Sequence, residues 1–240
     1  MKKIIILFLF ILPLNYLNAQ FYKDLKFNLS DSLKLVESSN SYQKKVDILM
    51  NIGIRYEWSK GDSAIIFFNK AAEIAKQNKD NILEFIAMSH ISMTYNQTIG
   101  NYPLGLHYAT ESGKLVNKIS NLTDSIRTFY NYNLTFSYGY LHNKELALKN
   151  LVERWPISKR VQPGFVDGNI GKAFYILEEY DSATKYNRLV VEFFNKKPYE
   201  KRWSGAYIVG GDIFRALKQY DSAIIYYKLS IPLTFISSLY

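Results

Sequence analysis

Tyr180-Asp181-Ser182-Ala183 is the stretch that decides the fold, because it returns as Tyr220-Asp221-Ser222-Ala223 and, without the Tyr, as Asp62-Ser63-Ala64. Aligning the final Ala of these strings reveals two weaker copies, which end at Gly105 and Ala147. The spacings between successive copies are then 41, 42, 36 and 40 residues. Self-similarity at such a period indicates a repeat protein built from one supersecondary unit.

An aromatic residue stands eight to ten positions before each of these five small residues, although the alignment used the small residues alone. The aromatic residues are Tyr56, Tyr95, Tyr138, Phe174 and Phe214. With 20 Tyr and 15 Phe in 240 residues, chance does not explain the agreement. The pattern suits a helix pair in which a small residue permits a close crossing and a flat ring fills the space beside it.

Hydrophobic periodicity indicates that the stretches between these residues are helices. In the segment 64–75, positions 64, 68, 71, 72 and 75 form one apolar stripe at helical spacing. We therefore predict an all-α fold, an alpha-alpha superhelix (solenoid) of about five helix pairs with a short lead-in helix. The expected elements are a lead-in helix at about 31–38 and pairs at roughly 42–78, 80–119, 123–155, 162–195 and 199–231.

The segment Asn169–Phe174, followed by Tyr180–Ala183, resembles a tetratricopeptide repeat (TPR) without gaps. Ile170 and Gly171 match the Leu-Gly of the family's first helix, and the resemblance covers about 42–231. The third copy departs from the pattern because it has Thr135 where the family has Gly. The copies also exceed the consensus length of about 34 residues, so we expect longer helices and an irregular superhelix.

The first residues read as a secretory signal peptide, with Lys2 and Lys3 before the apolar run 4–14 and a cleavage site after Ala19. An uncleaved anchor is the alternative. We expect a periplasmic or secreted chain that begins near Gln20. The expected domains are the signal peptide (1–19), a lead-in segment (20–41), the TPR-like domain (42–231) and an apolar tail (232–240). The absence of cysteine excludes disulfides and a lipid-anchored signal.

A narrower resemblance links the signal peptide, the lead-in helix and the string 61–71 to exported repeat regions of Bacteroidetes sensor histidine kinases and transcriptional regulators. It implies a ligand-sensing extracytoplasmic part of a two-component signal-transduction protein, present here as a fragment. On that interpretation the tail 232–240 leads into a missing region, and membrane association is expected only if the chain continues beyond residue 240. Alternatively, Pro232 breaks the last helix and the tail folds back, or it docks on a second chain.

The residues carry no pattern for catalysis. His90, His107 and His142 lack metal-ligand spacing, and no glycine-rich phosphate loop or nucleophile elbow occurs. We expect no enzyme, no cofactor and no metal. The net charge of +9 is spread through the expected helices and turns, and export makes nucleic acid an unexpected partner. The predicted function is an exported scaffold that binds a protein or peptide.

The tetratricopeptide resemblance implies a concave groove lined by the first helix of each pair. Carried over position by position, it predicts groove residues with an aromatic middle and polar groups in the last two pairs. The alternative is that the aromatic members pack against a neighbouring helix, and both interpretations stay open. The candidate binding residues are Trp58, Met93, Asn96, Tyr132, Phe136, Tyr140, Lys172, Tyr175, Asp212 and Arg215.

Overall fold

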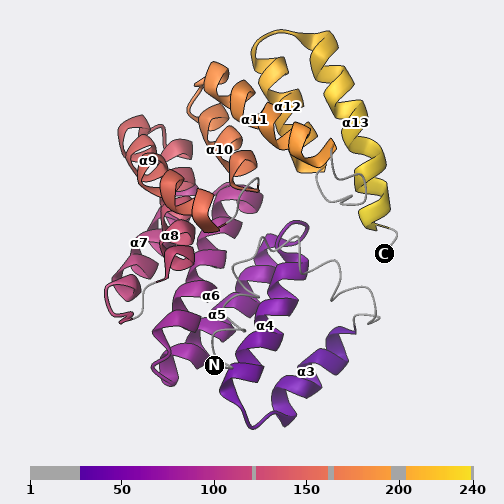
Figure 1. Cartoon of the computed structure of the whole chain (residues 1–240). Helices are drawn as coiled ribbons and strands as arrows, with labels where there is room; N and C mark the ends of the chain where they lie inside the picture. Colours follow the sequence, from indigo (N-terminus) through magenta and orange to yellow (C-terminus); the bar gives the residue numbers. More distant parts are fainter. Residues whose placement is uncertain (1–27, 121–122, 162–164, 196–203, 239–240) are drawn as a thin grey trace. The chain divides into compact units, whose positions relative to one another are not determined.

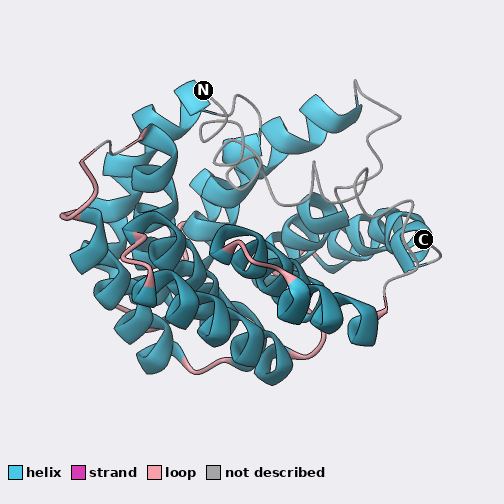
Figure 2. Cartoon of the chain, turned by 90° about the horizontal axis from the view of Figure 1, so that it is seen from below, coloured by secondary structure: helices cyan, strands magenta, loops and turns pink. Residues whose placement is uncertain are grey.

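The computed structural model describes residues 28–120, 123–161, 165–195 and 204–238, and the regular elements in these ranges are all helical (Figure 1). No strand occurs in the part of the chain that is described, as Figure 2 shows. Consecutive helices pack as antiparallel pairs against their neighbours in sequence, so the predicted all-α solenoid of helix pairs is confirmed.

The chain divides into two compact units, of which residues 26–150 form one. In this N-terminal unit each helix packs on the next one along the chain, and α6 also contacts α8. The lead-in helix α3 begins where Asn28 accepts hydrogen bonds from the backbone N–H groups of Ser30 and Asp31. The elements are α3 (Leu29–Ser38), α4 (Tyr42–Tyr56), α5 (Gly61–Gln77), α6 (Asn81–Thr94), the π-helix η1 (Tyr95–Ile99), α7 (Tyr102–Val116) and α8 (Asp124–Tyr140).

Helix α9 (Lys144–Val161) begins in the N-terminal unit, and residues from 151 onward belong to the second, C-terminal unit. In that unit the two helix pairs pack through α11 and α12, and α12 also contacts α10. Val190, Val191 and Ala206 form a buried apolar cluster between α11 and α12. The helices are α10 (Phe165–Ile176), α11 (Tyr180–Asn195), α12 (Ser204–Ala216) and α13 (Tyr220–Ser238).

The small residues that define the repeat are buried where the two helices of each pair cross. They are Ala64, Gly105, Ala147, Ala183 and Ala223. The crossing in the fourth repeat is close, because a Cβ added at Gly171 would lie only 3.0 Å from the backbone nitrogen of Asn187. In the first repeat the same Gly position, Gly53, makes room for the buried ring of Phe68.

The repeat aromatics are half-buried, and in four repeats each faces a second aromatic residue three positions after the small residue. In the third repeat that position is Asn150. Stacked or tilted rings fill the space beside each crossing, as the spacing predicted. The ring pairs are Tyr56–Phe67 at 6.1 Å, Tyr95–Tyr108 at 5.7 Å, Phe174–Tyr186 at 5.5 Å and Phe214–Tyr226 at 5.0 Å between centroids.

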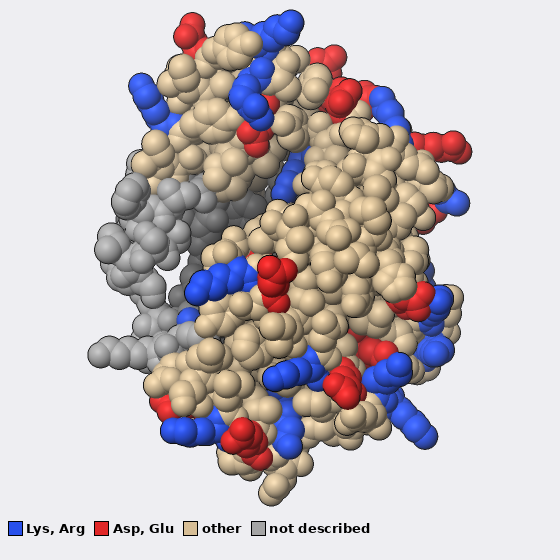
Figure 3. All heavy atoms as spheres, turned by 180° about the vertical axis from the view of Figure 1, so that it is seen from behind, with Lys and Arg blue, Asp and Glu red and all other residues tan. Residues whose placement is uncertain are grey.

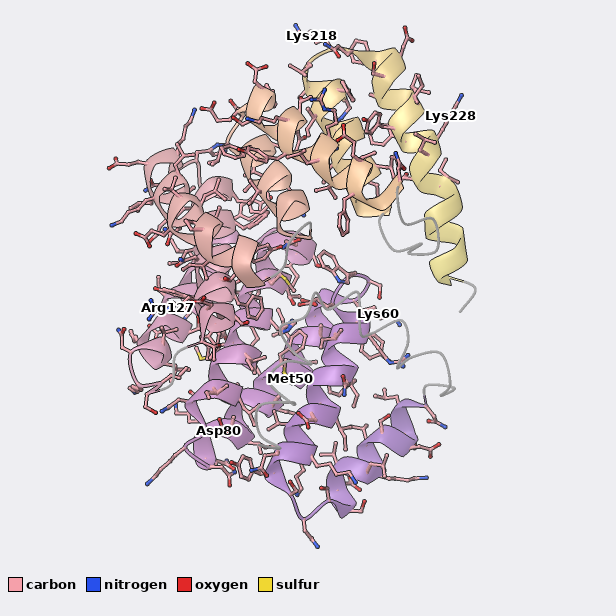
Figure 4. The ribbon with its side chains drawn as sticks, in the orientation of Figure 1. Met50, Lys60, Asp80, Arg127, Lys218 and Lys228 are labelled. Carbon is pink, nitrogen blue, oxygen red and sulfur yellow. The ribbon has the colours of Figure 1, made fainter. Side chains whose placement is uncertain are left out.

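The same aromatic residues also end the first helix of each pair. In every repeat the backbone carbonyl of the aromatic accepts a hydrogen bond from the N–H four positions before the small residue, for example Gln219 to Phe214 at 2.9 Å. The residue before this donor is left-handed in four repeats, with φ of 60° at Lys218, a residue labelled in Figure 4. This is the C-terminal cap that closes helices through a residue of positive φ. The equivalent residues are Gly100, His142 and Glu178.

Two prolines lie inside helices, where the sequence predicted helix ends. Helix α9 continues to Val161 through Pro156, and α13 continues to Ser238 past Pro232. The prediction that Pro232 breaks the last helix is therefore wrong, as are the ends expected at 155 and 231. A proline removes one N–H donor and its ring crowds the carbonyl four residues earlier, but an established helix can continue through it at some cost.

The predicted signal peptide and its cleavage site lie outside the described residues. Within the described ranges, no helix combines the length and the apolar character that crossing a membrane requires.

Candidate functional site

The predicted groove residues of the N-terminal unit differ in exposure. Met93, Asn96 and Phe136 are buried, at 6%, 3% and 1% exposure. Because these three side chains are buried beneath their helix surfaces, their contact with a ligand stays a prediction. Tyr132 and Tyr140 are half-buried, whereas Trp58 lies in the turn after α4 with 58% of its surface exposed.

An aromatic stripe runs along α8, on the face where the sequence predicted aromatic groove residues. The ring centroids of Phe129, Tyr132, Phe136 and Tyr140 follow one another at 6.5, 4.5 and 6.3 Å. Their spacing of three and four residues places them on one helix face. Tyr102, at the start of α7, stacks on Tyr140 with centroids 4.7 Å apart and planes 7° apart. Phe136 therefore packs in the core, whereas Tyr132 and Tyr140 are half-buried and their role in a groove stays a prediction.

Side chains of the π-helix η1 connect it to α8 and to the turn that follows α4. The Asn96 amide donates to the Ser137 hydroxyl of α8 at 2.8 Å, and the Gln97 amide donates to the Tyr132 hydroxyl at 2.6 Å. The Thr98 hydroxyl donates to the backbone carbonyl of Glu57 at 2.7 Å. In the sequence, the second repeat differs from the others in having one extra residue in its turn. In the structure, this extra residue is accommodated by the π-helix η1, and π-helical turns often occur at functional sites.

A buried polar pair, which the sequence analysis did not find, lies beneath this surface. Nδ1 of His90 on α6 is 3.0 Å from a carboxylate oxygen of Glu57, and both side chains are almost fully buried. The Thr94 hydroxyl lies 3.3 Å from the same oxygen. The imidazole packs between Phe68 and Phe129, with centroid distances of 5.1 and 5.5 Å. Because no solvent reaches it, we interpret this pair as a structural link between the first two repeats.

The predicted groove residues of the C-terminal unit come together in one place. Lys172 and Tyr175 lie on α10, Asp212 and Arg215 lie on the neighbouring α12, and Tyr227 of α13 joins them. We call these five residues the α10/α12 polar cluster. The Tyr227 hydroxyl donates to the Asp212 carboxylate at 2.7 Å, and the Arg215 guanidinium lies 3.6 Å from the same oxygen. Arg215 is also within hydrogen-bonding reach of Tyr175 and Tyr227.

Burial and charge set the protonation states in the α10/α12 polar cluster. Burial lowers the pKa of the Lys172 ammonium, and the Asp212 carboxylate opposes that effect. Burial and then the Asp212 charge raise the pKa of Tyr175, while burial and the hydrogen bond to Asp212 raise the pKa of Tyr227. Both phenols therefore keep their protons at neutral pH and can act as donors. Beside them stands the Arg215 side chain, 61% exposed, as a planar set of N–H donors.

The arrangement suits recognition of polar oxygen atoms. Phenol and guanidinium donors converge with one carboxylate acceptor, which matches the carbonyl, carboxylate and amide groups of a peptide. Tyr227 was absent from the sequence prediction, although its position four residues after Ala223 was visible. In the described ranges, no group of three or more His, Asp or Glu side chains lies together as metal ligands would.

One more titratable group stands out on α4, where an oxygen of Asp47 is buried without a hydrogen-bond partner. Burial raises the pKa of Asp47 from 3.8 to about 6. An unpaired carboxylate in such surroundings disfavours its own ionised form.

The fold is similar to that of a solved protein, BtubC (BKLC) from P. vanneervenii, whose crystal structure superposes with a TM-score of 0.59. The two sequences are 15% identical, and the match covers 88% of each chain. At this identity the likeness shows the helical fold alone. No protein-family model matches the sequence, and no curated protein matches it either.

Proposed function

We propose that this chain is an exported binding module of the tetratricopeptide type, which holds a protein or peptide on the surface formed by the first helices of its pairs. The observation that carries the proposal is the α10/α12 polar cluster. Four residues predicted from a groove pattern come from two repeats, and they meet there with a fifth residue from α13. The position of the repeat aromatics beside each helix crossing supports the tetratricopeptide assignment.

The cluster would bind the ligand's backbone rather than read its side chains. The Arg215 guanidinium and the Tyr175 hydroxyl offer donors to a carbonyl or carboxylate, while Asp212 accepts from an amide N–H. Because Asp212 is already bonded to Tyr227, its position is set before a ligand arrives. Preorganisation of this kind reduces the entropy lost on binding.

Site-specific photo-crosslinking tests the proposal on the full chain. A photoreactive residue replaces Tyr175, and the matched control carries it at Arg188, an exposed position on α11. Crosslinking in envelope extract should capture a peptide or protein at Tyr175 that the control does not capture, and Arg215→Ala should abolish the capture. Identical products from the two positions would refute binding at the cluster.

A sensory role in a longer receptor is the second candidate, supported by the receptor-like string 61–71 in the sequence. It makes a different prediction for the native protein. An antibody against residues 42–231 should then detect a polypeptide much longer than 240 residues in the membrane fraction. Detection of a chain of this length alone, outside the cytoplasm, would favour the independent binding module.

A further inference from the structure

Large apolar side chains are exposed at successive turns along one edge of the N-terminal unit. Trp58 lies between α4 and α5, Ile99 and Leu104 flank the turn between η1 and α7, and Leu141 lies between α8 and α9. Their exposed fractions are 58%, 37%, 38% and 36%. We call these four residues the apolar turn edge. Of these four residues, only Trp58 belongs to the candidate groove, and none of them is buried in the core.

Contacts between the turns make this edge continuous. Ile99 lies close to the start of α5, because a Cβ added at Gly61 would be 2.8 Å from the Ile99 side chain. The hydrogen bond from Thr98 to the Glu57 carbonyl connects the same two turns at 2.7 Å. The second and third turns meet through the stacked rings of Tyr102 and Tyr140. The exposed residues therefore belong to one row rather than to separate loops.

Two other turns carry charged and polar residues at their tips, although Tyr220, which follows the turn between α12 and α13, is 60% exposed. The turn between α5 and α6 carries Lys79 and Asp80, and that between α12 and α13 carries Lys218 and Gln219. Along the edge itself, Lys60 and Lys144 are offset by Asp62 and Glu145, which leaves no net charge. Figure 3 shows the same intermixing of positive and negative side chains on one face of the molecule.

The exposed area limits what can cover the edge. With ~150–250 Å² for each large side chain, the exposed fractions correspond to roughly 250–400 Å² of surface. A standard interface between folded proteins buries ~800 Å² per partner, so the edge alone cannot hold a second copy. A patch of a few hundred Å² on projecting turns does suit a surface that deforms around it.

We propose that the apolar turn edge docks on a lipid surface, where Trp58 and its apolar neighbours enter the interfacial region. Trp and Tyr favour the boundary between headgroups and acyl chains, and Trp58, Tyr102 and Tyr140 lie in or beside the row. Backbone hydrogen bonds also close these turns. The Lys60 N–H donates to the Tyr56 carbonyl at 2.7 Å, and Asn101 and Asn143 donate in the same way in the other two turns of the edge. Because these backbone groups are already hydrogen-bonded, moving the turns from water into the membrane interface costs less free energy.

The docking shares Trp58 with the candidate groove residues, but it does not depend on peptide binding, because the proposed function rests on the α10/α12 polar cluster of the C-terminal unit. The sequence alone predicted membrane association only through a continuation beyond residue 240, and the edge supplies a second route. Since the edge carries no net charge, burial of apolar side chains rather than attraction to anionic headgroups drives the contact.

The test uses the full chain with Trp155→Phe and Trp203→Phe, which leaves Trp58 as its one tryptophan. Vesicles of zwitterionic phosphatidylcholine, with part of the lipid brominated on its acyl chains, are added to it. The Trp58 emission should shift to the blue and be quenched by the brominated lipid. In the matched control, Trp58→Phe and Ile66→Trp place the reporter on α5, outside the edge, where the native side chain is 54% exposed. The control emission should stay unchanged, even if another segment holds the chain on the vesicle.

Leu104→Ser with Leu141→Ser should raise the lipid concentration needed for the Trp58 response about tenfold, because two apolar side chains no longer enter the bilayer. Ile66→Ser should leave the response unchanged, and circular dichroism checks that each variant is folded. An emission of Trp58 that vesicles do not alter would overturn the proposal, as would equal responses from both reporters. A blue shift that follows protein rather than lipid concentration would instead identify a second copy. A response confined to anionic vesicles and removed by salt would also overturn it.

Discussion

The unpaired carboxylate of Asp47 should make the protein less stable at neutral pH than at mildly acidic pH. Its pKa is raised to about 6 in the folded chain, against 3.8 for an ordinary Asp. The folded state therefore holds this proton more tightly than the unfolded state does. The stability that Asp47 contributes is fully present below about pH 4 and is lost as the pH rises through 6. At 1.36 kcal/mol per pKa unit the loss is at most about 3 kcal/mol. Partial exposure of the carboxyl reduces it to roughly 1–2 kcal/mol.

Asp47→Asn isolates this effect, because the amide imitates the protonated acid at every pH. We expect the variant to be about 1–2 kcal/mol more stable than the wild type at pH 7 and equal to it near pH 4. Urea unfolding followed by circular dichroism at several pH values measures the difference. The control is Asp31→Asn on α3, whose carboxylate is 65% exposed beside Lys34, and which should change stability little at any pH. A variant that is less stable than the wild type at pH 7 would refute the reasoning.

The remaining predictions concern packing, turns and the buried pair. Ala183→Leu should lower the stability by about 1–3 kcal/mol, because the residue is fully buried at a helix crossing; melting at the wild-type temperature would show that the crossing lies elsewhere. Lys218→Gly should raise the free energy of unfolding and Gly100→Ala should lower it, each by about 1 kcal/mol or less, since both positions have positive φ; the melting temperature should move in the same direction. Glu57→Ala should cost about 1–3 kcal/mol in urea unfolding because it leaves His90 buried without its partner, and an unchanged midpoint would count against that link.

The repeat could be predicted from the sequence because its signals are local. The carbonyl of Phe174 accepts from Glu179, and the N–H of Ala183 donates to the Glu179 carbonyl, so one turn ties the aromatic to the small residue. This explains why an alignment on the small residues recovered the aromatics. The helix ends near Pro156 and Pro232 were not predictable by the same route. A proline weakens a helix locally, whereas its continuation depends on packing along the whole element.

The candidate site was only partly predictable, because groove and core share one helix periodicity. Phe136 and Tyr140 are one helical turn apart on α8, yet one is 1% exposed and the other is half-buried. Their difference arises from neighbouring helices that the local pattern does not reveal. The Glu57–His90 pair illustrates the same limit, since its members come from different repeats and carry no shared motif.

One member of the α10/α12 polar cluster, Tyr227, occupies the repeat position four residues after the small residue. In the first repeat this position holds Phe68, which fills the space at the Gly of the first helix, and in the fourth it holds Asn187. In the fifth it holds Tyr227, whose ring would meet any Cβ at Gly211 at 2.4 Å. The ring therefore crosses α12 closely enough for its hydroxyl to reach Asp212. A position that packs the core in one repeat thus presents a phenol to the candidate site in another. Variation at such positions gives different chemistry to helix pairs of the same design.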